Sequence, residues 1–403
     1  MSLLVIILSC FDLTFAADQL LEPFQNLTVT TSKTISLPDG TFVGASITLK
    51  PRQDRTIKPS QSSGSVILKS NERFKNLLIV NTAELRLEDV GIQMPDSAHF
   101  IKAKSTSLVV FTRVLHHYTQ RYVGIVDLDN SDFEMIQNKI NPHTTGNSMI
   151  ISSSNSTKGE VKVTDCTFAR ISMEERVPVL IGLFVPDVII SHCSFSAIIN
   201  KVPFAGASTP IRHRSVSISD TTMDYVDGAL CGNLLYALMN GTLTLDRVTI
   251  SNSKPTIYMS QDVPYGVSTV EMSSCTLNSK LDLSRSSAVT INSCMFSNPV
   301  HEFMGGALAF GERLTNLEIT NSSFLKNDAS GGGAMMFAEM KSKPTFLIKN
   351  CTFSNQAGTG SDIYFEKLPS SVTQKSFVSC KSRSKMPSVY DMAKRKGYNW
   401  TNS

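Results

Sequence analysis

Apolar and polar residues alternate along this chain in short runs that recur at a nearly constant spacing. A typical run has four to six residues rich in Val, Ile, Leu and Thr, and it leads into a six-residue phrase such as VTDCTF at 163–168 or IKNCTF at 348–353. Alternation with a period of two is typical of β-strands. No long stretch combines helical periodicity with helix start and stop signals. The pattern therefore predicts an all-β chain built from repeats.

The last residue of each phrase marks an anchor position, and successive anchors are 19 to 29 residues apart. A second apolar run precedes the phrase in several units, so each unit has two or three strands. Such repeats predict a solenoid, here a right-handed parallel β-helix of about eleven coils wound from one chain. Coils stack about 4.8 Å apart, so the rod is roughly 50 Å long. The anchors are Ile92, His116, Ile140, Phe168, Phe195, Met223, Ile250, Leu277, Phe296, Phe324 and Phe353.

Equivalent residues of successive coils lie above one another in such a fold. The phenylalanine anchors are therefore expected to form an inward aromatic stack, and the cysteines two residues earlier a second inward column. Side chains that run parallel on adjacent coils are poorly placed for disulfide bonds, so we expect buried free thiols that pack as small hydrophobes. The cysteines of this column are Cys166, Cys193, Cys275, Cys294 and Cys351.

Four regions follow from the pattern. Residues 1–16 contain the apolar run LLVIIL and the small residues Thr14 and Ala16, which predicts a secretory signal peptide. Residues 17–75 are expected to cap the N-terminal end of the solenoid, and residues 76–366 to form the coils. Residues 367–403 lose the pattern and are expected to form a C-terminal cap and a basic flexible tail.

The signal peptide predicts a secreted protein or one displayed at the cell surface. A lipid anchor at Cys10 is an alternative, because ILSC at 7–10 loosely fits a lipobox. No later run is long and apolar enough to predict a transmembrane segment. Six acceptor sequons follow the signal, and their glycosylation would require a eukaryotic secretory route. They begin at Asn26, Asn155, Asn240, Asn321, Asn350 and Asn399.

Composition and motifs indicate no metal, cofactor or nucleic-acid partner. Charged residues are 18% of the chain, and the formal net charge of +4 lies largely in the C-terminal tail. Seven cysteines remain after the signal, an odd number that leaves at least one thiol unpaired, and CxxC spacing for zinc is absent. The glycines at 331–333 lack the lysine and helix of a phosphate-binding loop. We therefore predict a monomer without a cofactor or metal.

Two stretches carry a more specific signature. FLKNDASGGGA at 324–334 fits Phe-x-x-Asn-x-Ala followed by Gly-Gly-Ala, and FSNQAGTGSDIYF at 353–365 is a variant that ends in Gly-x-Asp-Ile-Tyr. A looser copy spans 296–308. These stretches resemble the polymorphic outer membrane protein repeat, and the chain upstream resembles the wider pectin-lyase-like β-helix family. The resemblance implies cell-surface display and adhesion.

One constellation could support chemistry. The residue before each cysteine position forms an outward column, in which Asp165, His192, Asp220 and Arg247 follow one another. Two carboxylates around a histidine could serve acid–base chemistry on a sugar, with Arg247 binding a substrate carboxylate. The alternative is that opposite charges one coil apart stabilise the stack, as cross-strand pairs do. The sequence lacks the motifs of polygalacturonases and pectate lyases.

The preferred interpretation is a non-catalytic β-helix with an adhesive role, which presents its faces and loops to a host surface, a matrix protein or a glycan. The alternative is a lyase or hydrolase of acidic polysaccharides that uses the column around His192. A third reading is a paralogue without independent activity. Fold alone does not decide among them.

Overall fold

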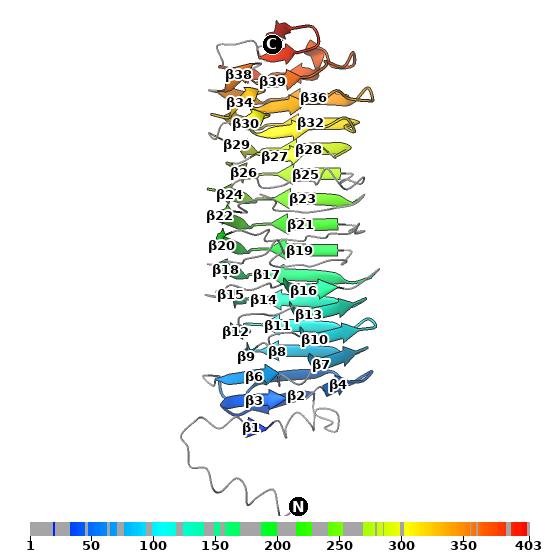
Figure 1. Cartoon of the computed structure of the whole chain (residues 1–403), viewed down its shortest axis with the longest axis vertical. Helices are drawn as coiled ribbons and strands as arrows, with labels where there is room; N and C mark the ends of the chain where they lie inside the picture. Colours follow the sequence, from blue (N-terminus) through cyan, green and yellow to red (C-terminus); the bar gives the residue numbers. More distant parts are fainter. Residues whose placement is uncertain are drawn as a thin grey trace, which may run out of the picture.

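The computed structural model describes an all-β chain wound into a long rod (Figure 1). The described residues are 19–20, 33–44, 47–62, 65–70, 76–93, 99–117, 124–140, 149–153, 158–169, 187–199, 215–227, 241–252, 269–278, 280–284, 286–298, 302–354, 356–359, 362–383 and 388–400. Within these ranges the coils wind in the right-handed sense and the strands of neighbouring coils pair in parallel, which confirms the predicted fold class.

Three sides of the rod are formed by sheets whose strands come from successive coils. Over the described residues, the first side is a 14-stranded sheet. Its strands are β2 (Thr34–Leu37), β5 (Arg55–Pro59), β8 (Glu84–Glu88), β11 (Leu108–Thr112), β14 (Asp132–Ile136), β17 (Glu160–Thr164), β19 (Asp187–Ser191), β21 (Ser215–Ser219), β23 (Thr242–Asp246), β25 (Thr269–Ser273), β28 (Ala288–Asn292), β32 (Asn316–Thr320), β36 (Thr345–Lys349) and β40 (Phe377–Val378).

The second side, as far as the structure describes it, is a 15-stranded sheet that follows the first after one corner in each coil. Its strands are β1 (Gln19–Leu20), β3 (Gly40–Gly44), β6 (Val66–Ser70), β9 (Gly91–Gln93), β12 (Leu115–His117), β15 (Lys139–Ile140), β18 (Thr167–Ala169), β20 (Ser194–Ile199), β22 (Thr222–Asp227), β24 (Thr249–Ser251), β26 (Thr276–Leu277), β29 (Met295–Phe296), β33 (Ser323–Leu325), β37 (Thr352–Ser354) and β41 (Lys381–Ser382).

The described strands of the third side belong to smaller sheets. Near the N-terminal end they are β4 (Ile47–Leu49), β7 (Asn76–Asn81), β10 (His99–Lys104), β13 (Gly124–Asp129) and β16 (Met149–Ser153). Near the C-terminal end they are β30 (Glu302–Met304), β34 (Asp328–Gly331) and β38 (Ala357–Thr359), with β27 (Leu281–Leu283), β31 (Leu308–Phe310), β35 (Met335–Phe337), β39 (Ile363–Phe365), β42 (Val389–Asp391) and β43 (Lys396–Tyr398). A short 3-10 helix, η2, covers Gln374–Ser376.

All eleven predicted anchors pair with one another in register along the second side. For example, Phe168 pairs with Phe195, and Phe195 pairs with Met223. The predicted number of coils is too low, because Phe42 and Leu68 occupy the same position before Ile92. These early coils were missed because their strands lack the six-residue phrase and its cysteine.

The anchors fill the interior as expected. The rings of Phe168 and Phe195 stack with centroids 4.7 Å apart and an interplanar angle of 2°. Phe324 lies between Phe296 and Phe353, with centroid distances of 4.9 and 5.1 Å. All five side chains are fully buried. A second stack on the third side, made of phenylalanines 310, 337 and 365, has spacings of 4.6 and 4.7 Å.

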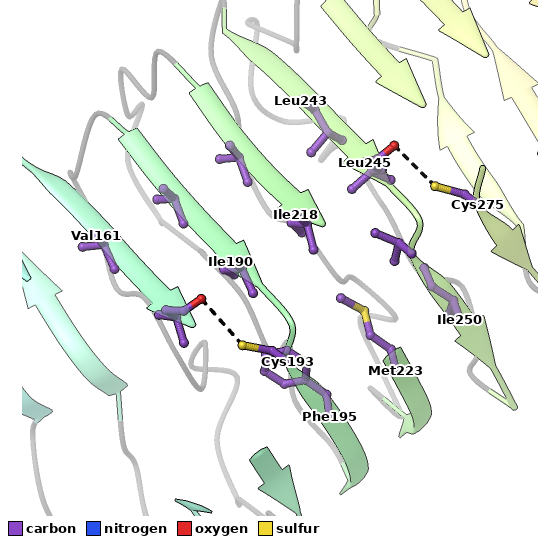
Figure 2. Packing of buried hydrophobic residues seen from close by; sticks show 14 of the residues in the cluster. Val161, Ile190, Cys193, Phe195, Ile218, Met223, Leu243, Leu245, Ile250 and Cys275 are labelled. Atoms are coloured by element: carbon purple, nitrogen blue, oxygen red, sulfur yellow. Dashed lines mark hydrogen bonds between the residues drawn. The ribbon is translucent and has the colours of Figure 1, made fainter. Parts of the chain in front are cut away.

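The cysteine position also forms one buried column, at the corner between the first and second sides (Figure 2). Cys193 donates to the Ser191 carbonyl and to the Val163 carbonyl one coil below, at 3.2 and 3.6 Å. Thr221 and Ser322, at the same position in other coils, donate to the corresponding carbonyl two residues earlier. Cys380 joins the column as a sixth member. The cysteines are free and buried, as predicted.

Three pairs of these thiols lie on adjacent coils: Cys166 with Cys193, Cys275 with Cys294, and Cys351 with Cys380. The hydrogen bond that Cys166 shares with the Cys193 thiol, together with burial, raises the pKa of Cys166, whereas the same hydrogen bond lowers the pKa of Cys193. Burial opposes the thiolate form at both members of each pair, and the thiols donate hydrogen bonds to backbone carbonyls, as Cys166 does to Thr164 and Cys193 to Ser191.

Replacing Cys193 by Ser is expected to change the free energy of unfolding by no more than about 1 kcal/mol, because a hydroxyl can make the same two donations. Urea denaturation followed by circular dichroism measures this. Cys193→Asp is the matched contrast: it should lower the midpoint strongly, since it buries a carboxylate among carbonyl groups. Equal stability of the Asp variant would contradict the buried position.

The segment 324–334, with its Phe-x-x-Asn-x-Ala and Gly-Gly-Ala pattern, has a structural role on the third side. Gly332 has a φ of +63°, and a Cβ there would lie 2.1 Å from the Met335 carbonyl oxygen. Asn327 is fully buried; its Oδ1 accepts from the Asn298 N–H at 2.6 Å and its Nδ2 donates to the Phe296 carbonyl at 3.3 Å. Glycine thus permits the bend, and the amide joins the turns of adjacent coils.

Regular coils extend beyond the predicted boundaries at residues 75 and 366. Strands β2, β3, β5 and β6 already pair with the long sheets, and β40 and β41 continue them. In the predicted tail, β42 and β43 form an antiparallel pair, and the Trp400 ring lies 5.8 Å from that of Phe377. Residues 388–400 therefore cover the C-terminal end of the core and have more regular structure than a loose tail.

Candidate binding surface

The corner between the first and second sides carries the predicted outward column. We name the residue before each cysteine position the corner column: Asp89, Arg113, Gln137, Asp165, His192, Asp220, Arg247, Ser274, Ser293, Asn321, Asn350 and Ser379. All have φ between 48° and 55°. Each backbone N–H from Asp89 to Asn350 donates to a strand-end carbonyl of the next coil, as Asp165 does to Ser191 at 3.1 Å. In each coil, one residue with a left-handed backbone conformation thus forms the turn, and its side chain points outward.

The four candidate catalytic residues do come together. Asp165, His192, Asp220 and Arg247 occupy successive coils of the corner column. Arg247 donates to both carboxylate oxygens of Asp220, at 2.5 Å from Nε and 2.8 Å from Nη2. It also contacts Asp246. His192 Nε2 lies 3.7 Å from Asp220 Oδ2, and the imidazole is 61% exposed.

This geometry does not suit acid–base catalysis. The Arg247 hydrogen bonds, with smaller attraction from His192, lower the pKa of Asp220, and they raise that of Arg247. A general acid requires a raised carboxyl pKa, and a strong base requires one near neutrality. Asp165 and Asp220 are two coils apart, about 10 Å between their backbones. Arg247 is occupied by protein carboxylates.

The same pair occurs where no catalytic group was predicted. Arg113 donates to Asp89 on the preceding coil, at 2.6 Å from Nε and 2.7 Å from Nη2. The hydrogen bond from Arg113 lowers the pKa of Asp89. Opposite charges directly across a ladder attract. An Asp–Arg pair that recurs at one position of the coil therefore stabilises the stacking of neighbouring coils. This recurrence favours the structural interpretation of the charged residues.

Replacing Asp220 by Asn is expected to reduce stability at neutral pH and to have no effect in strong acid. The folded-state pKa of Asp220 is lowered. The stability that its carboxylate contributes is therefore fully present above the pKa of an Asp in the unfolded chain, and it is lost as pH falls through the folded-state pKa. Urea midpoints of both proteins across this range measure the difference. Asp89→Asn, which removes the partner of Arg113 in the same column, should show the same pH dependence, and equal stability of parent and Asp220 variant at neutral pH would contradict the ion pair.

Hydroxyl groups line both flanks of the charged part of the corner column. The outward position after each cysteine position forms a hydroxyl column, in which successive residues pair in register. Its members are Thr167, Ser194, Thr222, Thr249 and Thr276, all exposed or half-buried. At the ends of the first-side strands lie the hydroxyl residues Thr164, Ser191, Ser219 and Ser273, together with the carboxylate of Asp246.

Sequence reasoning overlooked these flanks, although the signal was present. Each phrase from 163 to 277 has Ser or Thr directly after the cysteine position. Side chains of the flanks contact one another: the Thr164 and Ser191 hydroxyls are 3.3 Å apart, and the Ser273 hydroxyl donates to Asp246. We name the corner column from 165 to 274 and its two hydroxyl flanks the corner surface.

Toward the C-terminal end the corner column continues as an amide ladder. Asn321 donates to Asn292 at 2.9 Å, and Asn350 donates to Asn321 at 3.1 Å. Asn321, Asn350 and Asn399 are exposed, as glycosylation acceptors must be. The other three predicted acceptors, Asn26, Asn155 and Asn240, and the predicted signal peptide lie outside the described residues.

In the described part of the chain, neither a metal-binding cluster nor a bilayer-spanning helix is present. No group of three or more His, Cys, Asp or Glu side chains gathers there so as to hold a metal ion. No helix in those ranges has the length and apolar character that crossing a bilayer requires.

Comparison with known proteins finds no family model, no curated protein and no solved structure that matches this chain. The structure itself establishes a parallel β-solenoid. The function has to be argued from the surfaces of this solenoid.

Proposed function

We propose that this chain is a secreted or cell-surface β-solenoid that binds glycans or glycan-bearing surfaces without cleaving them. The observation that carries the proposal is the corner surface, where hydroxyl, imidazole and charged groups stand in register on successive coils and pair among themselves. The partner would be a host cell surface or an extracellular matrix.

The corner surface has the physical properties that such binding needs. Its groups are about 4.8 Å apart along the rod, on backbone that every coil fixes by hydrogen bonds. Short Ser and Thr side chains lose little entropy on binding. Each hydroxyl contact with a sugar is weak, but many in a row add up when the ligand is an extended chain. Affinity spread over many coils is typical of solenoids, whose surface is long and continuous.

Export and family membership are part of the proposal. The apolar segment at 3–8 followed by small residues supports a signal peptide, and the exposed sequon residues support an extracellular environment. The bend at Gly332 and the hydrogen bond of Asn327 to the preceding coil give a structural role to the motif that resembles the repeat of the polymorphic outer membrane proteins. Adhesion is the role that this resemblance implies.

A polysaccharide lyase or hydrolase is the second candidate. It is supported by the assembly of Asp165, His192 and Asp220 on successive coils. It is opposed by the ion pair with Arg247, which holds Asp220 as a weakly basic carboxylate. Release of reducing ends or unsaturated sugars from polygalacturonate would support it, provided that Asp220→Asn abolishes the release.

Binding of the purified chain to glycan arrays and to cells tests the main proposal. Thr222→Lys/Thr249→Lys places two long side chains on the corner surface and is expected to weaken binding at least about tenfold. Ser60→Lys/Gln61→Lys adds the same charge in an exposed turn after β5 and is the matched control. Unchanged binding by the corner variant, or absence of binding by the parent chain, would contradict the proposal.

A further inference from the structure

The C-terminal end of the rod is a concentration of positive charge. Residues 367–403 contain eight Lys or Arg and one Asp, whereas the remaining residues contain 30 Lys or Arg and 33 Asp or Glu. The net charge of +4 therefore combines a strongly basic end with a weakly acidic rod. The last coil and the β42–β43 pair, which carry these residues, lie at one tip of the molecule (Figure 1).

The cations are exposed and distributed over the last coil. Lys381 and Arg383 are two residues apart at the end of the second side, so both project outward from one rung. Arg395 and Lys396 lie at the turn between β42 and β43, and Lys375 lies in η2. We name the exposed residues Lys375, Lys381, Arg383, Lys394, Arg395 and Lys396 the basic end.

Most of these charges have no acidic partner, in contrast to charges along the rod. Among the described residues, Lys394 is the member of the basic end that forms an ion pair, with Asp391 at 3.5 Å. Elsewhere, Arg113, Arg247, Lys341 and Lys367 each contact a carboxylate one coil away. Like charges gathered without counter-charges repel one another and disfavour folding, so a polyanionic ligand that neutralises them would bind favourably.

The surroundings of the basic end indicate which polyanion fits. The described exposed side chains between its cations are mainly hydroxyl and amide groups, such as Ser370, Thr373 and Gln374. Large exposed apolar side chains are limited there to Val378 and Met392, whereas a membrane surface needs a continuous apolar face. The cap aromatics Tyr398 and Trp400 pack on each other and on the core, so they do not offer faces for stacking nucleic-acid bases.

We propose that the basic end is a second binding surface, separate from the corner surface, and that its partner is an acidic polysaccharide. Lys ammonium and Arg guanidinium groups would contact successive carboxylates or sulfates of one chain, with the adjacent hydroxyl and amide groups bonding to sugar hydroxyls. The inference goes beyond the proposed function, because it assigns a different surface and a charged ligand.

The test uses the full purified chain and a matched pair of variants. Lys381→Gln/Arg383→Gln/Arg395→Gln removes three unpaired charges from the basic end. Lys58→Gln/Lys139→Gln/Lys162→Gln removes three exposed charges that form no ion pair with described residues of the rod. Binding to immobilised heparin and polygalacturonate is measured at low and high salt, with neutral dextran, phosphatidylserine vesicles and duplex DNA in parallel.

The parent chain is expected to bind both acidic polysaccharides, with affinity that falls as salt rises. The variant of the basic end should bind about tenfold or more weakly, and the control variant less than about twofold. No binding by the parent chain, equal loss in both variants, or tighter binding to vesicles or DNA would overturn the inference. Binding to neutral glycans that depends on Thr222 and Thr249 would survive those outcomes, so the proposed function can stand or fall separately.

Discussion

Replacing Phe324 by Ala is expected to lower the free energy of unfolding by about 4 kcal/mol. The ring is fully buried between Phe296 and Phe353 in the aromatic stack, with centroids 4.9 and 5.1 Å away. Its removal leaves a cavity that the neighbouring coils cannot close, because their spacing is fixed by the β-ladders on both sides. Urea denaturation monitored by circular dichroism measures the loss.

Two further variants control for this result. Phe324→Leu should cost clearly less, because Leu277 and Ile250 occupy the same position in other coils. Ser323→Ala changes the adjacent, outward side chain and should have little effect. If the Ala variants at 323 and 324 were equally stable, Phe324 could not be an inward anchor.

Replacing Asn327 by Ala is expected to destabilise the protein by about 3 kcal/mol, since two buried groups lose their partners. The Asn298 N–H would lose its bond to Oδ1, and the Phe296 carbonyl its bond from Nδ2. The side chain is fully buried, so water does not replace it readily. The change in the urea midpoint reports the loss.

Asn350→Ala is the matched control for Asn327. This side chain also bonds to the preceding coil, where its Nδ2 donates to Asn321 Oδ1 at 3.1 Å, but it is exposed at the corner. Water can replace that bond, so its loss should be small. A larger effect at 350 than at 327 would contradict the assignment of Asn327 to the interior.

The strand pattern was sufficient to predict the fold and the register. Each anchor, from Ile92 to Phe353, was identified from its position in the phrase, and each pairs as expected. The reason is physical: inward positions of a parallel solenoid repeat coil after coil, so the same residue types recur. Coils that use other inward residues, such as Phe42 and Leu68, carry no such signal.

The C-terminal end and the corner surface were harder to predict. The cap depends on Trp400 packing on Phe377, a contact between residues with no repeat pattern. The column of Asp165, His192, Asp220 and Arg247 was located correctly, but its chemistry depends on side-chain geometry. The structure shows that the Arg247 guanidinium donates to both oxygens of Asp220. This carboxylate therefore belongs to an ion pair and is not placed to act as a proton donor.

Zero-length carbodiimide cross-linking of the unmodified protein tests most directly whether the coils stack in register. Lys341 Nζ lies 2.7 Å from Glu312, and Lys367 Nζ lies 2.5 Å from Glu339, in pairs 29 and 28 residues apart. Mass spectrometry of the digested protein should identify both links, each joining residues one coil apart. Links of these lysines to carboxylates two or more coils away, with neither one-coil link present, would contradict the stacked solenoid.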